Sequence, residues 1–237
     1  MKDKIITFKG IKFYNYNINQ ILSKLKNGGY LVAPAASALA KINENKNYYN
    51  SLKESKVAIF DSGFFCILLR IFKNYEIKKF SGFLFIQKFL KLKKIKNKKI
   101  LLVDPSKNDS YLNKLLLNKK KFHKVQSYVA PLYKKGKIKD LKLLKLVKKY
   151  KPDFIIINIG GEIQEVLANF LYFKLKNKTI IICTGAAIGF MTKTQAPINN
   201  FLDKYYLGWL VRVTYNPKKF FFRVIKSFSL INLFIKN

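Results

Sequence analysis

Short runs of consecutive apolar residues alternate along the chain with longer segments whose apolar positions follow a helical period. Most of the runs are continuous and rich in Ile, Val and Leu, which is typical of strands buried on both faces of a parallel sheet. They predict six strands, over residues 30–34, 57–60, 100–103, 125–129, 154–159 and 179–182.

Helices are predicted around these strands. In "KDLKLLKLVKKY", Leu141, Leu144 and Val147 recur at helical spacing with lysines between them. The same reasoning predicts seven helices, over residues 18–26, 37–53, 64–72, 84–94, 110–120, 138–150 and 164–176. Strands that alternate with helices at this spacing imply βαβ units. The predicted fold class is therefore α/β and Rossmann-like, a mostly parallel sheet flanked by helices.

After residue 197 the strand–turn rhythm stops, and two helices broken at Asn216-Pro217 are predicted. The second helix is amphipathic, with an apolar and a basic face: Phe221, Ile225, Phe228 and Ile231 against Lys219, Arg223 and Lys226. Such a helix either lies in a membrane interface or packs on the core with its basic face in water. We therefore divide the chain into an α/β domain, residues 1–196, and a basic, aromatic helical appendage, residues 197–237.

The charge of the chain is strongly unbalanced. It has 47 Lys and Arg against 12 Asp and Glu among 237 residues, a net charge of +35. Such a field favours polyanions: nucleic acid, acidic lipid head groups or diphosphate substrates. A nucleic-acid-binding protein is one interpretation of this charge. However, the strand sequences predict buried strands, and no RNA-binding or zinc motif occurs. Nucleic acid is therefore the less favoured partner.

The termini and cysteines indicate the compartment. "MKDKIITFKG" has no apolar core of a signal peptide, and no apolar stretch reaches the ~18 residues of a membrane span. Cys66 and Cys183 stand in apolar stretches without CxxC spacing, as expected of reduced thiols in a core. We expect a protein that is cytoplasmic, or peripheral on the inner face of the membrane.

Candidate chemistry stands where the predicted strands end, because parallel α/β sheets bind ligands beyond the carboxyl ends of their strands. The residues found there are Asp61, Asp104, Gly160, Gly161, Gln164, Glu165 and Gly185. The glycine-bearing turns could open backbone N–H groups toward a phosphate. No turn matches GxGxxG or the P-loop pattern, which argues against an NAD or Walker-type site.

Asp61 is the best candidate for a general base, since a carboxylate at a strand end can accept a proton from an attacking hydroxyl. The competing interpretation is a helix N-cap, a position that Asp also favours. The chain has no DxD motif. We therefore expect no metal and no other cofactor.

Motifs over most of the chain follow the order and spacing of a known family, and the strongest of them stand in its last third. They are "KPDFIIINIGGEIQE", which keeps Gly160, Gln164 and Glu165; "TGAAIGFMTKTQAP", which keeps Gly185, Ala196 and Pro197; and "LGWLVRVTYNPKKFFFR", which keeps Leu207, Trp209, Arg212, Pro217 and Arg223. Upstream, Asp61, Arg70 and Ser81-Gly82 also match. On these residues the chain resembles the bacterial WecG/TagA/CpsF glycosyltransferases.

The resemblance implies an inverting hexosyltransferase of cell-surface polysaccharide synthesis. It would move a sugar, usually of the N-acetylmannosamine type, from a UDP-sugar donor to a polyprenyl-diphosphate-linked sugar acceptor at the inner membrane face. Asp61 would be the base, and Gly160, Gln164, Glu165 and Gly185 would lie at the nucleotide-sugar site. Arg212 and Arg223 would neutralise the diphosphate, Arg70 would be a further substrate-binding residue, and the tail would dock on an anionic membrane surface.

Departures from the family pattern bear on specificity. The family's Thr-x-Asn after the first strand is Ala33-Pro34-Ala35 here, and Glu162, Gln195 and Gly208 replace its Pro, Arg and Glu. A transferase with a different donor or acceptor and a relative that binds without transferring both remain open at this point, as does homo-oligomerisation.

Overall fold

The computed structural model describes residues 4–134, 136, 138–175 and 177–235, with only the backbone at Lys219. Its centre is an eight-stranded sheet in the order β1-β2-β4-β3-β8-β7-β5-β6, in which β1 and β2 are antiparallel and the other neighbouring strands are parallel. The strands are β1 (Ile5–Phe8), β2 (Ile11–Tyr14), β3 (Gly29–Val32), β4 (Val57–Ala58), β5 (Ile100–Asp104), β6 (Val125–Val129), β7 (Phe154–Ile157) and β8 (Ile180–Cys183). The predicted α/β class with a mostly parallel sheet is confirmed.

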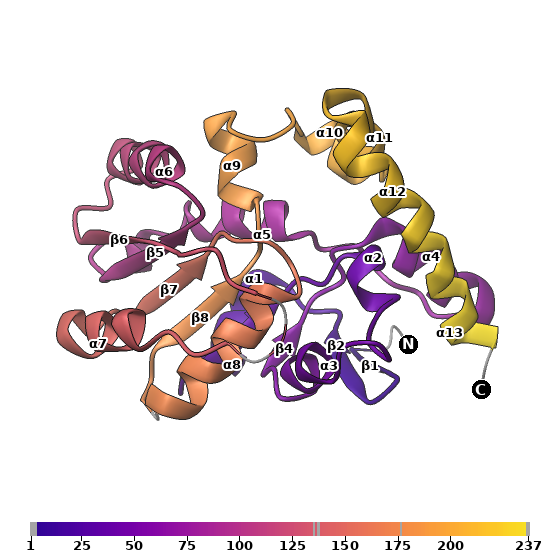
Figure 1. Ribbon diagram of the computed structural model, residues 1–237, viewed down its shortest axis with the longest axis horizontal. Coiled ribbons are helices and arrows are strands. Elements are labelled where there is room, and N and C mark those ends of the chain that lie inside the picture. The colour runs from indigo at the N-terminus through magenta and orange to yellow at the C-terminus, as the bar shows by residue number, and fades with distance from the viewer. Residues whose placement is uncertain (1–3, 135, 137, 176, 236–237) are drawn as a thin grey trace.

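Helices cover both faces of the sheet (Figure 1). They are α1 (Ile18–Lys24), α2 (Ala36–Leu39), α3 (Lys46–Lys53), α4 (Gly63–Lys73), α5 (Gly82–Phe89), α6 (Lys107–Lys119), α7 (Leu141–Tyr150), α8 (Ile163–Leu175), α9 (Ala187–Thr192), α10 (Asn200–Lys204), α11 (Gly208–Tyr215), α12 (Pro217–Phe228) and α13 (Asn232–Ile235). Two short 3₁₀ turns, Lys93–Ile95 and Ser229–Ile231, complete the described elements.

The buried side chains form two cores, one on each face of the sheet. Ile155 and Ile157 of β7 belong to the core under α3, α7 and α8, whereas Phe154 and Ile156 belong to the core under α1, α5 and α9. Successive side chains of a strand point to opposite faces. Both faces are therefore covered, which explains why the strands read as unbroken apolar runs.

The predicted pattern differs from the structure in several places. Helix α9 was not predicted, and the helix predicted over residues 84–94 ends at Phe89 and is followed by a separate 3₁₀ turn. The hairpin β1–β2 was not predicted; it turns at Lys9 and Gly10, whose φ angles of 46° and 77° suit a tight two-residue hairpin turn. The single helix predicted over residues 37–53 is wrong. It is α2 followed by α3, because the Asn45 side chain accepts a hydrogen bond from the Tyr48 N–H and starts a new helix there.

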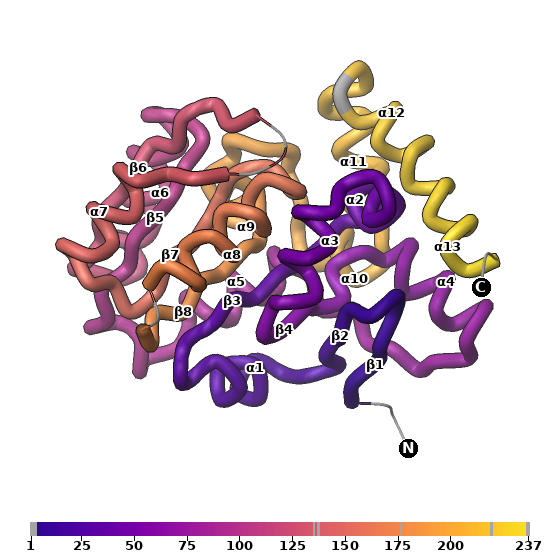
Figure 2. Tube along the Cα trace, turned by 60° about the horizontal axis from the view of Figure 1, so that its bottom comes forward, coloured from indigo at the N-terminus to yellow at the C-terminus, as the bar shows by residue number. Residues whose placement is uncertain are grey.

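The chain after Ala196 is mostly helical where it is described, and the predicted break at Asn216-Pro217 is confirmed, but four helices, α10 to α13, stand where two were predicted. Both views place α12 and α13 at the end of the molecule near α4, away from α6 and α7 (Figures 1 and 2). Leu230, Leu233 and Phe234 belong to the main core, so the last turns are an integral part of the fold. The domain boundary at residue 196 stays a prediction.

Candidate active site

Asp61 stands three residues after β4 and immediately before the start of α4. The helix is capped by Ser62, whose hydroxyl accepts from the Phe65 N–H at 3.2 Å, so the N-cap interpretation of Asp61 is wrong. Instead, Asp61 Oδ1 accepts from the Gly82 N–H at the start of α5, at 2.8 Å. The Asp61 side chain is thus turned away from its own helix toward a segment twenty residues further along the chain.

That segment is held against the end of β4 by the backbone. The Phe80 N–H donates to the Phe60 carbonyl at 3.0 Å, which places residues 79–82 beside Asp61. Burial raises the pKa of Asp61 above its usual range, opposed by the Gly82 N–H and by the positive charges of Arg212 and Lys79. A carboxylate with a raised pKa between two cations has the properties that a general base needs.

Lys79 is also tied to the appendage. Its Nζ lies 2.6 Å from both the Asp203 Oδ1 and the Asp203 carbonyl oxygen, and the Ser81 hydroxyl donates to Asp203 Oδ2 at 2.7 Å. This Lys79–Asp203 ion pair is mostly buried, with side-chain exposures of 12% and 16%. It joins α10 to the segment that contacts Asp61, across 124 residues of sequence.

A second contact fixes the same junction. A Cβ placed on Gly63 would collide with the ring of Tyr206, so the absence of a side chain at Gly63 lets the turn after α10 reach the start of α4. Lys79 Nζ lies 5.2 Å from the centroid of the same Tyr206 ring. The appendage therefore packs directly on the residues that follow Asp61.

Arg212, on α11, brings a guanidinium into this group. Its Cζ lies 4.9 Å from the centroid of the Phe190 ring, and burial lowers its pKa while Asp61 opposes that shift. Among the described residues, its Nε is buried without a hydrogen-bond partner. Arg223, on α12, is an electrostatic neighbour of Arg212 and of Glu162 and has an exposed side chain. A guanidinium with an unused donor beside a second cation suits an anionic oxygen.

Gln164 and Glu165 are buried, and they contact protein groups. Gln164 Oε1 accepts from the Gly185 N–H at 2.9 Å, and its Nε2 donates to Glu165 Oε1 at 2.9 Å. Gly185 has a φ of 57°, so the Gln164 amide fixes a left-handed turn after β8. Burial raises the pKa of Glu165 to about 7. In this arrangement Gln164 positions the turn after β8; the direct contact with a nucleotide sugar stays a prediction.

The turn after β7 is open. Gly160 and Gly161 are exposed, and a Cβ on either would meet no atom within 4 Å. The turn after β8 is packed more closely: a Cβ on Gly82, whose N–H donates to Asp61, would lie 3.1 Å from the Thr184 Cβ. The turn after β8 thus lies beside the start of α5, and free space remains in front of Gly160 and Gly161.

Arg70 and Asp104 stand outside this group. Arg70 is exposed on the last turn of α4, and the cations that act on the Asp61 carboxyl are Arg212 and Lys79. Its substrate-binding role stays a prediction. Asp104 ends β5, separated from β4 by three strands. Its Oδ1 accepts from the side-chain amides of Asn113 and Asn158, both at 2.7 Å.

Lys79 and Asp203 were missed from sequence. Ser81-Gly82 had pointed to this segment, but nothing local marks Asp203 as the partner of a lysine so far away along the chain.

Within the described residues, no helix is both long and apolar enough to cross a bilayer. A comparison with curated proteins found no match. The family model described as Glycosyl transferase WecG/TagA/CpsF family matches residues 6–237. The chain therefore belongs to the WecG/TagA/CpsF family of glycosyltransferases.

Proposed function

We propose that the protein transfers a sugar, of the N-acetylmannosamine type or related to it, from a UDP-sugar to a polyprenyl-diphosphate-linked sugar during cell-surface polysaccharide synthesis. The observation that carries this proposal is the Asp61 carboxylate at the carboxyl end of a parallel strand, which accepts from the Gly82 N–H at 2.8 Å and is acted on by the positive charges of Arg212 and Lys79. Family membership supplies the reaction class to which this chemistry is applied.

In the proposed reaction Asp61 removes the proton from the acceptor hydroxyl as its oxygen attacks the anomeric carbon. The new C–O bond forms on one face of the sugar while the bond to UDP breaks on the other, so one displacement inverts the anomeric configuration. General-base catalysis of this kind contributes roughly 10²- to 10⁴-fold in rate. The positive charge of Lys79 and Arg212 keeps Asp61 able to ionise despite its burial.

The departing UDP carries negative charge that must be neutralised. Arg212 offers the unpartnered Nε among the described residues, and Arg223 lies near it. Charge-assisted hydrogen bonds from guanidinium groups stabilise diphosphate oxygens. We propose that these arginines serve as the cationic partners of the leaving group, which is a metal-independent mechanism.

The acceptor and its location are part of the same proposal. The exposed apolar and basic residues of α12 suit an anionic membrane surface, where a polyprenyl-diphosphate would present its sugar. We infer that the protein acts as a peripheral protein on the inner face of the membrane. Nucleic acid stays the less favoured partner.

The test is release of UDP from a panel of UDP-sugars, measured with and without short-chain polyprenyl-diphosphate-linked sugars. We expect one donor to give acceptor-dependent UDP release that persists in the presence of a metal chelator. Donor binding by calorimetry without turnover on any acceptor would contradict the proposal and favour a family member that binds without transferring.

A further inference from the structure

One face of α12 is apolar and left uncovered. Phe221, Ile225 and Phe228 recur at i, i+4 and i+7 and are 54%, 50% and 56% exposed. The helix packs against α2, and Phe220 and Val224 are less exposed than these three. Most of the apolar stripe predicted from the sequence therefore does not pack on the protein; its exceptions are Phe228, whose ring contacts Phe64, and Ile231, which is partly buried.

Helix α4 carries a second uncovered apolar face. Phe64, Ile67 and Ile71 recur at i, i+3 and i+7, so they share one side of the helix. Ile67 is 42% exposed and Ile71 is 69% exposed, whereas Phe64 is partly buried against the main core. A single exposed apolar residue is ordinary on a protein surface, but several in line on a helix mark an interaction site.

The two faces meet. The Phe64 and Phe228 rings lie edge to face with centroids 5.5 Å apart, and the Phe72 ring of α4 lies 5.5 Å from the Phe234 ring of α13. Both views show α4, α12 and α13 at the same end of the molecule (Figures 1 and 2). We call the combined residues the apolar strip: Phe221, Ile225 and Phe228 from α12 with Phe64, Ile67 and Ile71 from α4.

The charge around the strip is of one sign. Residues 62–75 and 204–237 contain no Asp or Glu, whereas they include Arg70 and Lys73 of α4 and Lys226 on the basic face of α12. Trp209 and Tyr215 of the neighbouring α11 are exposed. Apolar residues flanked by cations and by exposed Trp and Tyr are what an anionic lipid surface binds. A nucleic acid would use the cations but leave the aliphatic side chains unpaired.

We propose that α4 is a second membrane-contacting helix, and that the apolar strip seats the protein on anionic phospholipid with Asp61 near the lipid surface. The proposal rests on the proposed function for the identity of the acceptor. Helix α4 begins two residues after Asp61, and Ile67 lies four residues beyond that start, about 6 Å along the axis. A membrane contact at Ile67 and Ile71 therefore brings the base to the level at which a lipid-linked diphosphate leaves the bilayer.

The first test is co-sedimentation of the full chain with vesicles of phosphatidylcholine mixed with phosphatidylglycerol. Ile67→Ser with Ile71→Ser should weaken vesicle binding roughly tenfold or more, because two apolar side chains lose their burial in lipid. The matched control is Leu132→Ser with Leu141→Ser, which removes two other exposed apolar residues. Equal binding by the α4 variant and the control would overturn the proposal.

The second test reports on position. The thiols Cys66 and Cys183 are buried, so an environment-sensitive dye can be attached selectively at Ile71→Cys or at the control Leu132→Cys. Addition of the same vesicles should shift the emission of the dye at residue 71 to shorter wavelength and leave the dye at residue 132 unchanged. An unchanged dye at residue 71 on vesicle-bound protein would contradict the contact.

Transfer assays separate this proposal from the proposed function. The Ile67→Ser, Ile71→Ser variant should lose transfer to a vesicle-borne acceptor and keep wild-type transfer to a short-chain, water-soluble acceptor. If neither the variant nor the wild type transfers, the proposed function fails while the vesicle result still decides the role of α4. If the strip instead mediates self-association, the variant will lower the oligomeric mass without affecting vesicle binding, which would overturn the membrane assignment.

Discussion

Asp61, Asp104 and Glu165 all have a pKa raised by burial, and they differ in what surrounds them. The side-chain partners of Asp104 and Glu165 are neutral: each carboxylate accepts hydrogen bonds from side-chain amides. Asp61 alone of the three has two cations acting on it, Arg212 and Lys79. The cations favour the ionised form in a buried setting, which makes Asp61 the carboxylate suited to proton transfer.

Asp104 gives a pH-dependent prediction that is independent of catalysis. Burial raises its pKa to about 6, so between its unfolded pKa and that value the folded state binds more protons than the unfolded state. The contribution of Asp104 to stability is therefore present at low pH and lost as pH rises through about 6. Asp104→Asn should gain about 1–3 kcal/mol over wild type at pH near 8 and nothing near pH 4, measured by urea unfolding.

The measurement near pH 4 is the control for the measurement near pH 8. Because Asn keeps an acceptor for the amides of Asn113 and Asn158, the substitution changes the charge at residue 104 and keeps these hydrogen bonds. An equal stability difference at both values would show that Asp104 does not titrate differently in the folded state.

Gln164→Ala removes the partner of the Gly185 N–H and of Glu165. Leaving buried polar groups unpaired should cost about 1–3 kcal/mol of unfolding free energy. The freed turn after β8 should also weaken UDP-sugar binding in calorimetry. Asn169→Ala is the matched control, since this amide on the same helix bonds the Tyr30 hydroxyl. A Gln164→Ala protein with wild-type donor affinity would remove Gln164 from the positioning role.

At the scale of elements, regular packing was predictable and long-range contacts were not. The apolar runs located β3, β4, β5, β7 and β8 because these strands are buried on both faces, whereas β6 is a partly exposed edge strand. The hairpin β1–β2 alternates buried and exposed residues over only four positions per strand, a weak signal in a short segment. Asp61 was predicted because it directly follows an apolar run that is visible in the local sequence. Lys79 could not be predicted in this way, because its position depends on the ion pair with Asp203, 124 residues away.

The Lys79–Asp203 ion pair predicts how α10 supports the site. Asp203→Ala removes the carboxylate that neutralises a mostly buried lysine and accepts from the Ser81 hydroxyl, so we expect a loss of about 2–4 kcal/mol in stability. Hydrogen exchange should quicken at residues 79–82, and transfer should slow. The control Asp153→Ala breaks the exposed Lys98–Asp153 pair and should cost under about 1 kcal/mol. Unchanged exchange at residues 79–82 would contradict the role of α10.

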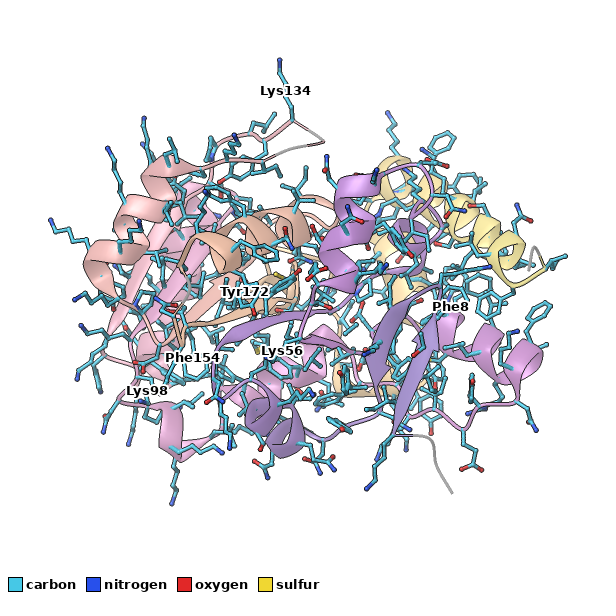
Figure 3. All side chains as sticks on the ribbon, turned by 90° about the horizontal axis from the view of Figure 1, so that it is seen from below. Phe8, Lys56, Lys98, Lys134, Phe154 and Tyr172 are labelled. Carbon is cyan, nitrogen blue, oxygen red and sulfur yellow. The ribbon has the colours of Figure 1, made fainter. Side chains whose placement is uncertain are left out.

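At the scale of the whole molecule, the net charge of +35 is spread widely over the surface, and the labelled Lys98 and Lys134 point away from the body (Figure 3). The exposed apolar residues of α4 and α12 instead gather at one end. The positive charge would therefore attract the protein to any anionic surface. The apolar strip would favour a lipid surface over a nucleic acid, because only lipid can bury its apolar side chains. Deleting residues 216–237 would not test this, because it would also remove Leu230, Leu233 and Phe234 from the core.

Salt should separate the two contributions. Binding to phosphatidylglycerol-containing vesicles should weaken with added salt but level off, because burial of the apolar strip is not screened. Binding to RNA should fall continuously over the same range, as counterion release requires. Vesicle binding that disappears in parallel with RNA binding would show that charge alone holds the protein to the membrane.

The most direct test of the account is the Asp61→Asn variant, with its rate of transfer and its affinity for the UDP-sugar measured on the same preparation. Asn keeps an acceptor for the Gly82 N–H, so the fold and donor site should be retained. We predict donor affinity close to wild type in calorimetry and a transfer rate lower by roughly 10²- to 10⁴-fold, the usual contribution of a general base. Transfer within a few-fold of wild type would contradict the assignment of Asp61 as the base.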